Sequence, residues 1–247
     1  IVAAPAPFVE HIALNHGFAP FADKAVRQAL YLAMNRKARL EAIYHGRPIE
    51  TESYVPHGHW AFDDGLPKHS HDPAAAKALL DKAGWLPSAD GIRQKDGVRL
   101  AFTNSTSAGS QSREQAQQLL KQDWREIGVD MTIDNMPGAV IWGEFWQKSQ
   151  YQSVMVASNF LQGSDPDVTP RFSSKAIPAQ GGSGLNTYQY RNAEVDGLLE
   201  RGSREMDQAV RRKIYQRLQQ IIREDLVFLP VSQSVIVEGV KAKLTGY

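Results

Sequence analysis

The chain has 247 residues, of which 42% are hydrophobic and 22% charged, and this length can bury a sizeable core without disulfides. The 28 Lys and Arg against 27 Asp and Glu give a net charge of +1, which argues against a nucleic-acid-binding domain because such domains need a basic surface. The absence of Cys excludes thiol nucleophiles, iron–sulfur clusters and Cys-ligated zinc.

The N-terminal third is predicted to form one strand and three helices. Isolated apolar residues in Phe8–Asn15 predict a strand, and the spacing of apolar residues after Asp23 predicts a first helix. A second helix is expected over 36–44, behind an Asn cap. Residues 47–71 show no periodicity and predict a long surface loop, whereas 73–83 follow an Asp cap and predict a helix that ends at a glycine.

Residues 98–158 alternate between strands and helices. Strands are predicted over 98–103, 129–133 and 153–157, and helices over 110–127 and 138–149. This β-α-β-α-β order, with short right-handed connections, predicts three parallel strands covered by helices and therefore an α/β fold. Ligands bind outside the carboxyl ends of such strands, so the candidate binding loops are 104–109, 135–138 and 158–170.

Further elements flank this unit on both sides. Asp-Gly pairs at 90–91 and 96–97 predict a hairpin. Two amphipathic helices are expected behind Asn192 and Asp207, with a solvated outer face of mixed charge, and a final strand is expected over 231–240. The apolar stretches are far shorter than the roughly 20 residues that a membrane-spanning helix needs.

Four histidines suggest one alternative function. His57, His59, His69 and His71 form two His-x-His pairs, and two imidazoles so spaced on a strand can share zinc or nickel. A mobile loop would lose entropy in forming such a site, and no catalytic carboxylate spacing accompanies the histidines. The sequence also lacks a Gly-x-Ser-x-Gly elbow and a P-loop, so we expect no enzyme.

Aromatic residues gather in and beside the predicted binding loops. Trp142, Phe145 and Trp146 share one side of the helix predicted over 138–149, where they either pack in the core or line a cleft. Phe160 directly follows the third predicted strand, at the position where a binding loop should begin. We therefore expect Phe160 to contact a ligand.

Several ordered segments carry a resemblance to a known family. Residues 15–34 read NHGFAPFADKAVRQALYLAM. Further matches lie at Pro56–Trp60, Ile127–Val129 and Asn192–Asp196, and the last match is the dipeptide Leu229-Pro230. Together they resemble the family 5 extracellular solute-binding proteins, the dipeptide, oligopeptide and nickel receptors of ABC importers.

The resemblance implies a fold, a function and a location. It implies a type II periplasmic-binding-protein-like lobe in which 1–247 form the second, C-terminal lobe, with hinge strands near 8–15 and 231–240. Such a protein captures a peptide or peptide-like solute between two lobes and hands it to the ABC permease, without a cofactor or a nucleic-acid partner. It also implies export to the periplasm, with the export signal outside this chain.

One loop allows the family's site residues to be carried over. Peptide-binding members place an aspartate just after the central strand, where it pairs with the ligand's α-amino group, and this chain has Gln162 there; Asn159 stands where Trp is frequent. Asp165 and Asp167 are the candidates to replace the missing carboxylate. The predicted ligand-binding residues are Asn104, Trp142, Asn159, Phe160, Gln162, Asp165, Asn186 and Tyr188.

Overall fold

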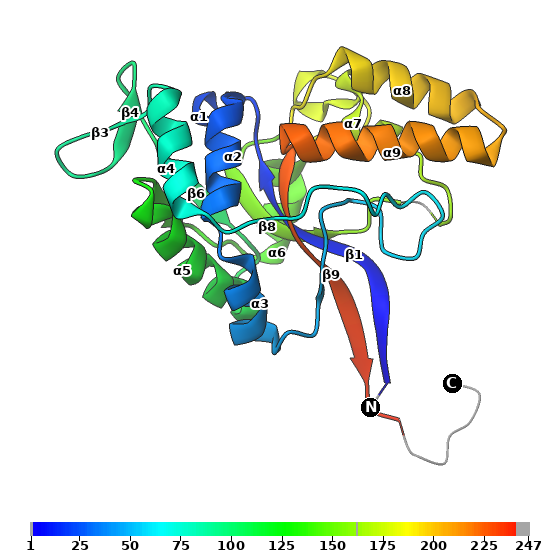
Figure 1. The fold of residues 1–247 in the computed structure, drawn as a ribbon, viewed down its shortest axis with the longest axis horizontal. Helices are drawn as coiled ribbons and strands as arrows, with labels where there is room; N and C mark the ends of the chain where they lie inside the picture. The colour runs from blue at the N-terminus through cyan, green and yellow to red at the C-terminus, as the bar shows by residue number, and fades with distance from the viewer. Residues whose placement is uncertain (1, 162, 241–247) are drawn as a thin grey trace.

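The computed structural model describes residues 2–161 and 163–240 and is organised around a mixed six-stranded sheet. The strand order is β2-β9-β1-β8-β6-β7, and helices cover both faces (Figure 1). The strands are β1 (Val2–Leu14), β2 (Ile49–Glu50), β6 (Ala101–Ser105), β7 (Asp130–Ile133), β8 (Ser153–Ser158) and β9 (Phe228–Glu238).

The predicted parallel unit is present at one side of this sheet. Strand β6 pairs in parallel with both β7 and β8, and α5 (Gln111–Glu126) makes the first crossover. The predicted strand over 98–103 is wrong at its start, because Val98–Arg99 form strand β5 of a separate small sheet. Apolar alternation continues across that boundary, so the pattern alone does not reveal the break.

The helix predicted over 138–149 is interrupted. Helix α6 (Gly138–Val140) passes into a π-helical turn over Ile141–Phe145, where Gly143 has a non-helical ψ of −138°. Glycine lacks the Cβ that restricts other residues, so a kink at this position carries little steric cost.

Strand β1 lies between β8 and β9 and is antiparallel to both. Its register pairs Val9 with Ser158 and Leu14 with Ser153, so the carboxyl end of β8 lies near the point where β1 enters the sheet. Beyond that point β1 and β9 continue as a two-stranded ribbon that leaves the body of the molecule (Figure 1). The strands predicted over 8–15 and 231–240 are confirmed, and both begin earlier than predicted.

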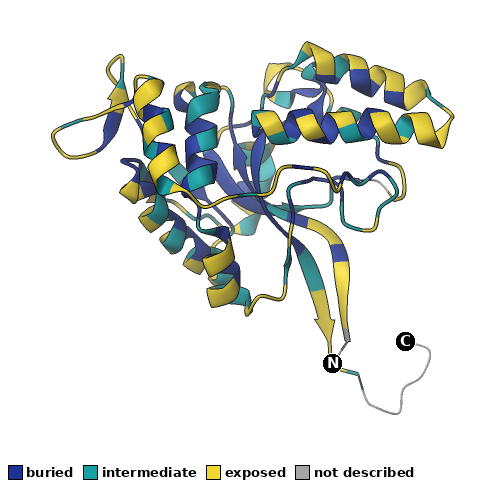
Figure 2. Ribbon diagram, viewed as in Figure 1, coloured by how far each residue is buried: buried dark blue, intermediate teal, exposed yellow. Residues whose placement is uncertain are grey.

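The sheet separates two hydrophobic clusters. One contains Ile12 and Leu14 with residues of α2 and α5, and the other contains Ala13 and Val154 with residues of α8 and α9. Figure 2 shows the buried central strands between helices whose outer faces are exposed. Besides α5 and α6, the helices of the structure are α1 (Ala19–Ala22), α2 (Lys24–Ala33), α3 (Arg36–Tyr44), α4 (Pro73–Lys82), α7 (Thr169–Phe172), α8 (Ala193–Arg204) and α9 (Gln208–Asp225).

The predicted helix starts are confirmed by their caps. The side chains of Asn35, Asp72 and Asp207 accept hydrogen bonds from backbone N–H groups in the first turns of α3, α4 and α9. Within the described ranges, no helix combines the length and apolar character needed to cross a membrane. Short 3₁₀ turns at Ser174–Ala176 and Pro178–Gln180 follow α7.

The predicted hairpin is confirmed as a small second sheet. It contains β3 (Leu86–Pro87), β4 (Arg93–Lys95) and β5 (Val98–Arg99). Asp96 and Gly97 join β4 to β5 with φ values of 52° and 78°, the positive values that primed hairpin turns require.

The surface loop predicted over 47–71 is only partly a surface loop. Thr51, Ser53, Tyr54 and Val55 are buried, and the Ser53 hydroxyl donates to the Gln219 side chain of α9 at 2.8 Å. Polar residues that find hydrogen-bond partners can be buried without apolar periodicity, so this burial is not visible in the pattern.

Arg39 of α3 is a buried cation without a hydrogen-bond partner. Its side chain is enclosed, and none of its three guanidinium nitrogens meets an acceptor among the described residues. Burial lowers the pKa of this guanidinium to about 10, with Asp123 acting in the opposite direction. A charge that is desolvated without hydrogen bonds destabilises the folded state.

Replacing Arg39 with Met should therefore stabilise the protein, because Met fills similar space without a charge. We expect Arg39→Met to raise the free energy of unfolding in urea by about 1–4 kcal/mol. The control Lys37→Met, at an exposed position of the same helix, should change it by less than about 0.5 kcal/mol. A loss of stability in Arg39→Met would contradict this account.

Candidate functional site

The carboxyl ends of the three parallel strands form one edge of the sheet, here called the carboxyl edge. The loops after β6 and β7 meet there, because Ser107 and Met136 form a parallel bridge. The Trp142 indole N–H donates to the Ser107 hydroxyl at 2.9 Å, and its ring packs edge-on against Trp146. Trp142 is half-buried at this edge, so one side of the indole packs inward and part of it stays accessible.

The loop after β8 forms the next part of the carboxyl edge. The Asn159 carbonyl accepts from Arg171 at 2.8 Å, and the Asn159 side chain accepts from the Leu161 N–H. Ser164 offers its carbonyl to both the His59 ring and the Trp60 indole at 3.0 Å. The segment around 59–60 therefore holds this loop from the outside.

Asp165 in the same loop is neutralised by Arg211 of α9. The Arg211 Nη2 atom lies 2.9 and 3.2 Å from the two carboxylate oxygens, and the guanidinium also packs over the Trp60 ring. Desolvation alone raises the pKa of Asp165, but hydrogen bonds from Arg211 and the Asp167 N–H hold that pKa below its usual value. Asp165 is therefore an ionised, paired carboxylate.

Phe160 and Tyr188 lie in the core. Both contact the ring of His11 in β1, and the rings of Phe160, Phe172 and Phe228 stack against one another. The Tyr188 hydroxyl donates to His11 Nε2 at 3.0 Å. The cluster around His11 encloses Phe160, whereas the sequence led us to expect ligand contact at this position; that contact stays a prediction.

Asn104 and Asn186 are also buried, and their side chains are engaged in hydrogen bonds. Asn104 donates to the Ser153 hydroxyl at 2.7 Å and accepts from Gln117 at 2.8 Å. Asn186 donates to the carbonyls of Ser173 and Tyr190 and accepts from the Tyr190 N–H. This geometry favours a role in holding the loops over direct contact with a solute.

Trp142, Asn159 and Asp165 are the predicted residues that the structure places at the carboxyl edge with accessible side chains. Gln162 lies outside the described residues. Two basic side chains of this edge, Arg171 and Arg211, escaped the sequence reasoning. For Arg211 a sequence signal existed. Arg211 and Tyr215 are four residues apart on a predicted helix, and this spacing places the two side chains on one face of that helix.

The four histidines do not come together as the alternative metal-binding function would require. His59 donates through Nε2 to Ser164 and accepts at Nδ1 from the Ala61 N–H, so both ring nitrogens are engaged. His69 donates to the Tyr31 carbonyl at 2.7 Å, and burial lowers its pKa to about 4. Over residues 2–161 and 163–240, no three His, Asp or Glu side chains are grouped closely enough to hold a metal ion.

Comparison with known proteins establishes the family. Residues 1–179 match the model of the bacterial extracellular solute-binding proteins, family 5 Middle. The chain belongs to this family. It is 26% identical over 239 residues to the heme-binding protein A of Haemophilus influenzae, and 25% identical over 250 residues to the dipeptide-binding protein of Escherichia coli.

These alignments cover 97% and 100% of this family 5 chain but only 42% and 44% of the two relatives. The chain thus spans less than half the length of these relatives.

Solved structures agree with the assignment. The oligopeptide-binding protein AppA of Bacillus subtilis, in complex with a nonapeptide, matches with a TM-score of 0.87 and 25% identity over 95% of this chain and 46% of its own.

An oligopeptide-binding protein of Thermus thermophilus, complexed with a pentapeptide, matches with a TM-score of 0.85 and 27% identity over 94% of this chain and 42% of its own. All four of these proteins are named as binding proteins. The resemblance seen in the sequence and the periplasmic-binding-protein-like α/β fold are therefore both confirmed.

A buried histidine, His11, and a partly buried one, His16, make the stability of this family 5 chain depend on pH. Burial lowers the pKa of His11 and of His16 to about 3, well below the unfolded value of 6.5. Their neutral state contributes full stability above pH 6.5. As the pH falls from 6.5 towards 3, the unfolded chain takes up protons first, so the unfolding free energy drops by up to about 1.4 kcal/mol per pH unit for each histidine.

Replacing His11 should remove its share of this pH dependence. We expect His11→Phe to reduce the slope of unfolding free energy against pH between 6 and 4, measured by urea denaturation at each pH. The exposed His71→Gln serves as the control and should leave the slope unchanged. An unaltered slope in His11→Phe would show that His11 is not the neutral, buried group described above.

Proposed function

We propose that this chain is the second lobe of a two-lobed solute-binding protein that captures an oligopeptide or peptide-like solute for an ABC importer. The observation that carries this proposal is the fit, at 25% and 27% identity, to two oligopeptide-binding proteins whose structures contain peptides. The function is binding without catalysis.

The placement of the carboxyl edge supports a cleft between two lobes. This edge lies at the same end of the sheet as the β1–β9 ribbon, through which the chain leaves the body. Phe8, Ile236 and Val237 are exposed apolar residues of that ribbon. We assign the ribbon as the hinge, so that a solute at the carboxyl edge contacts both lobes when they close and shifts the population towards the closed state.

The chemistry of the edge suits a peptide backbone. The loops supply backbone N–H and C=O groups, and Trp142 supplies an apolar face with an anchored indole. Asp165 is already paired with Arg211, so it is not a free partner for a ligand's α-amino group. Gln162 can hydrogen-bond but carries no charge. This combination favours main-chain recognition, including that of peptides with blocked amino ends.

The same proposal places the protein outside the cytoplasmic membrane. The family is one of extracellular solute-binding proteins, which agrees with an exported, periplasmic receptor. Its partners are then the solute and the ABC permease subunits of the inner membrane.

Calorimetry on the two-lobed protein tests this function. We expect oligopeptides to bind, and we expect Trp142→Ala to weaken that binding by about tenfold or more, because a half-buried aromatic anchor at an interface is removed. The control Leu86→Ala changes a side chain that is 56% exposed on the distant hairpin and should leave affinity unchanged. Heat from a sugar or a chelated metal, with none from any peptide, would overturn the proposal.

A further inference from the structure

A cavity of about 680 Å³ lies away from the carboxyl edge, between α2, α4, the 65–70 segment and the end of α9. Leu226 lines it just before β9 begins, and Phe228 pairs with Ala13 at the opposite end of β1 from Val9. The cavity is thus separate from the proposed solute site. Its size is within the range of about 300–1,000 Å³ that is usual for small-molecule sites.

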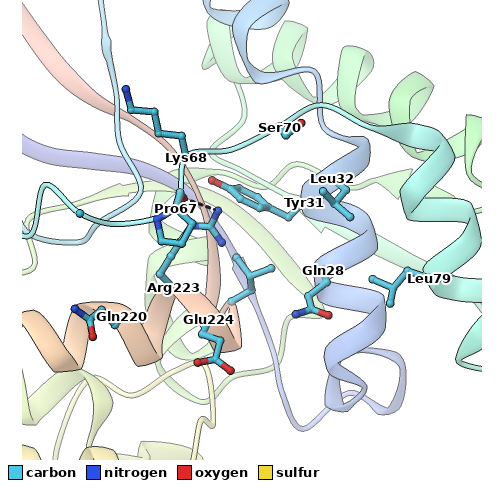
Figure 3. Close-up of a pocket in the computed structure, with 12 residues that line it drawn as sticks. Gln28, Tyr31, Leu32, Pro67, Lys68, Ser70, Leu79, Gln220, Arg223 and Glu224 are labelled. Carbon is cyan, nitrogen blue, oxygen red and sulfur yellow. Dashed lines mark hydrogen bonds between the residues drawn. The ribbon is translucent and has the colours of Figure 1, made fainter.

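The apolar part of this cavity comes from three elements. Leu32 of α2, Leu79 of α4 and Leu226 line it, and Pro67 closes it on the loop side. Figure 3 shows Gln28, Leu32 and Leu79 on one side, Gln220 and Glu224 on another, and the Tyr31 ring between α2 and the loop. Such a lining accommodates an apolar ligand body.

Arg223 supplies a cation in this apolar setting. Its side chain is only 13% exposed, and its guanidinium lies 4.5 Å from the centre of the Tyr31 ring. Nε donates to Glu52 at 2.7 Å. Nη2 donates to the Pro67 carbonyl at 3.1 Å, a bond drawn in Figure 3. Among the described residues, Nη1 has no acceptor. A largely desolvated guanidinium with unused N–H groups is suited to a carboxylate.

The other two charged side chains of the lining, Glu224 and Lys68, do not compete with Arg223 for a ligand carboxylate. Glu224 also lines the cavity, and its carboxylate accepts from Lys24 at 3.1 Å, so its charge is already paired. Lys68 extends away from the other labelled side chains in Figure 3. Gln28 and Ser70 line the rim and add neutral polar groups.

We infer that this cavity is a second binding site, which takes a small monocarboxylate with an apolar body. The carboxylate pairs with Arg223 Nη1, and the apolar body packs against Leu32, Leu79 and Leu226. This site is independent of the solute site at the carboxyl edge.

Titration calorimetry with octanoate tests the inference. We expect octanoate to bind, octanamide to bind about tenfold more weakly because it lacks the charge, and hexanoate to bind about tenfold more weakly because it lacks two methylenes. N-acetyl-leucyl-leucine presents the same chemistry as a peptide C-terminus. Its affinity relative to octanoate identifies which source of carboxylate the site prefers, and either preference supports the site.

Two variants locate the binding. Arg223→Gln should weaken octanoate binding by about tenfold or more, while Arg217→Gln, at an exposed position of the same helix, should not. Because Arg223 also holds Glu52, a second variant leaves that ion pair intact: Ser70→Trp fills the cavity from its rim and should abolish binding. Ser203→Trp, at an exposed position of α8, is its control.

Absence of binding at 10 mM octanoate, equal affinity for octanamide, or binding that survives either Arg223→Gln or Ser70→Trp would overturn the second site. None of these outcomes bears on peptide binding at the carboxyl edge. An unchanged peptide affinity in both variants is expected, so the failure of one proposal is distinguishable from the failure of the other.

Discussion

The pairing of β1 with both β8 and β9 is the constraint on which the rest of the structure depends. It inserts an antiparallel strand beside the parallel unit and fixes Val9 opposite Ser158. Because side chains alternate along a strand, His11 enters the aromatic cluster under α8 and α9 while Ile12 enters the cluster under α2 and α5. One strand therefore contributes side chains to both cores. The same register places the carboxyl edge at the end of the sheet from which the β1–β9 ribbon extends. A slip of one residue would exchange the two faces.

Glu52 provides a second, electrostatic constraint. Its carboxylate accepts from Arg36 at 2.6 Å, from Arg223 at 2.7 Å and from the Tyr31 hydroxyl at 2.6 Å. Desolvation alone raises the pKa of Glu52, but the two arginines hold it below its usual value. A buried carboxylate is tolerated only when its partners satisfy it, and here the partners come from α2, α3 and α9. The network thus anchors the long segment after β2 to both helical layers and holds Arg223 in the lining of the cavity.

Sequence reasoning succeeded where structure is determined locally. Caps at Asn35 and Asp72 and the Asp96-Gly97 turn are short-range signals, and each marks a real boundary. It could not predict burial that depends on distant partners. Phe160 directly follows a strand, where a binding loop should begin, yet Phe172 and Phe228 pack against it in the core, and its contact with a ligand stays a prediction. Trp142 was left open between core and cleft, and the structure leaves its indole half-buried, packed on Trp146 and hydrogen-bonded to Ser107, so its contact with a ligand stays a prediction.

The segment 51–71 contacts both proposed sites, and this limits how they can influence each other. Near one end, His59 and Trp60 hold the Ser164 carbonyl at the carboxyl edge. Near the other, the Pro67 carbonyl accepts from Arg223 at the cavity. Coupling between two sites requires an element whose arrangements are bound differently by the two ligands. Between these contacts, Gln219 and Gln220 of α9 bind the segment at Ala61 and Asp63. Because α9 holds the segment between these two contacts, a displacement of Pro67 by a ligand is not transmitted along the segment to Ser164. The two sites should therefore bind their ligands independently.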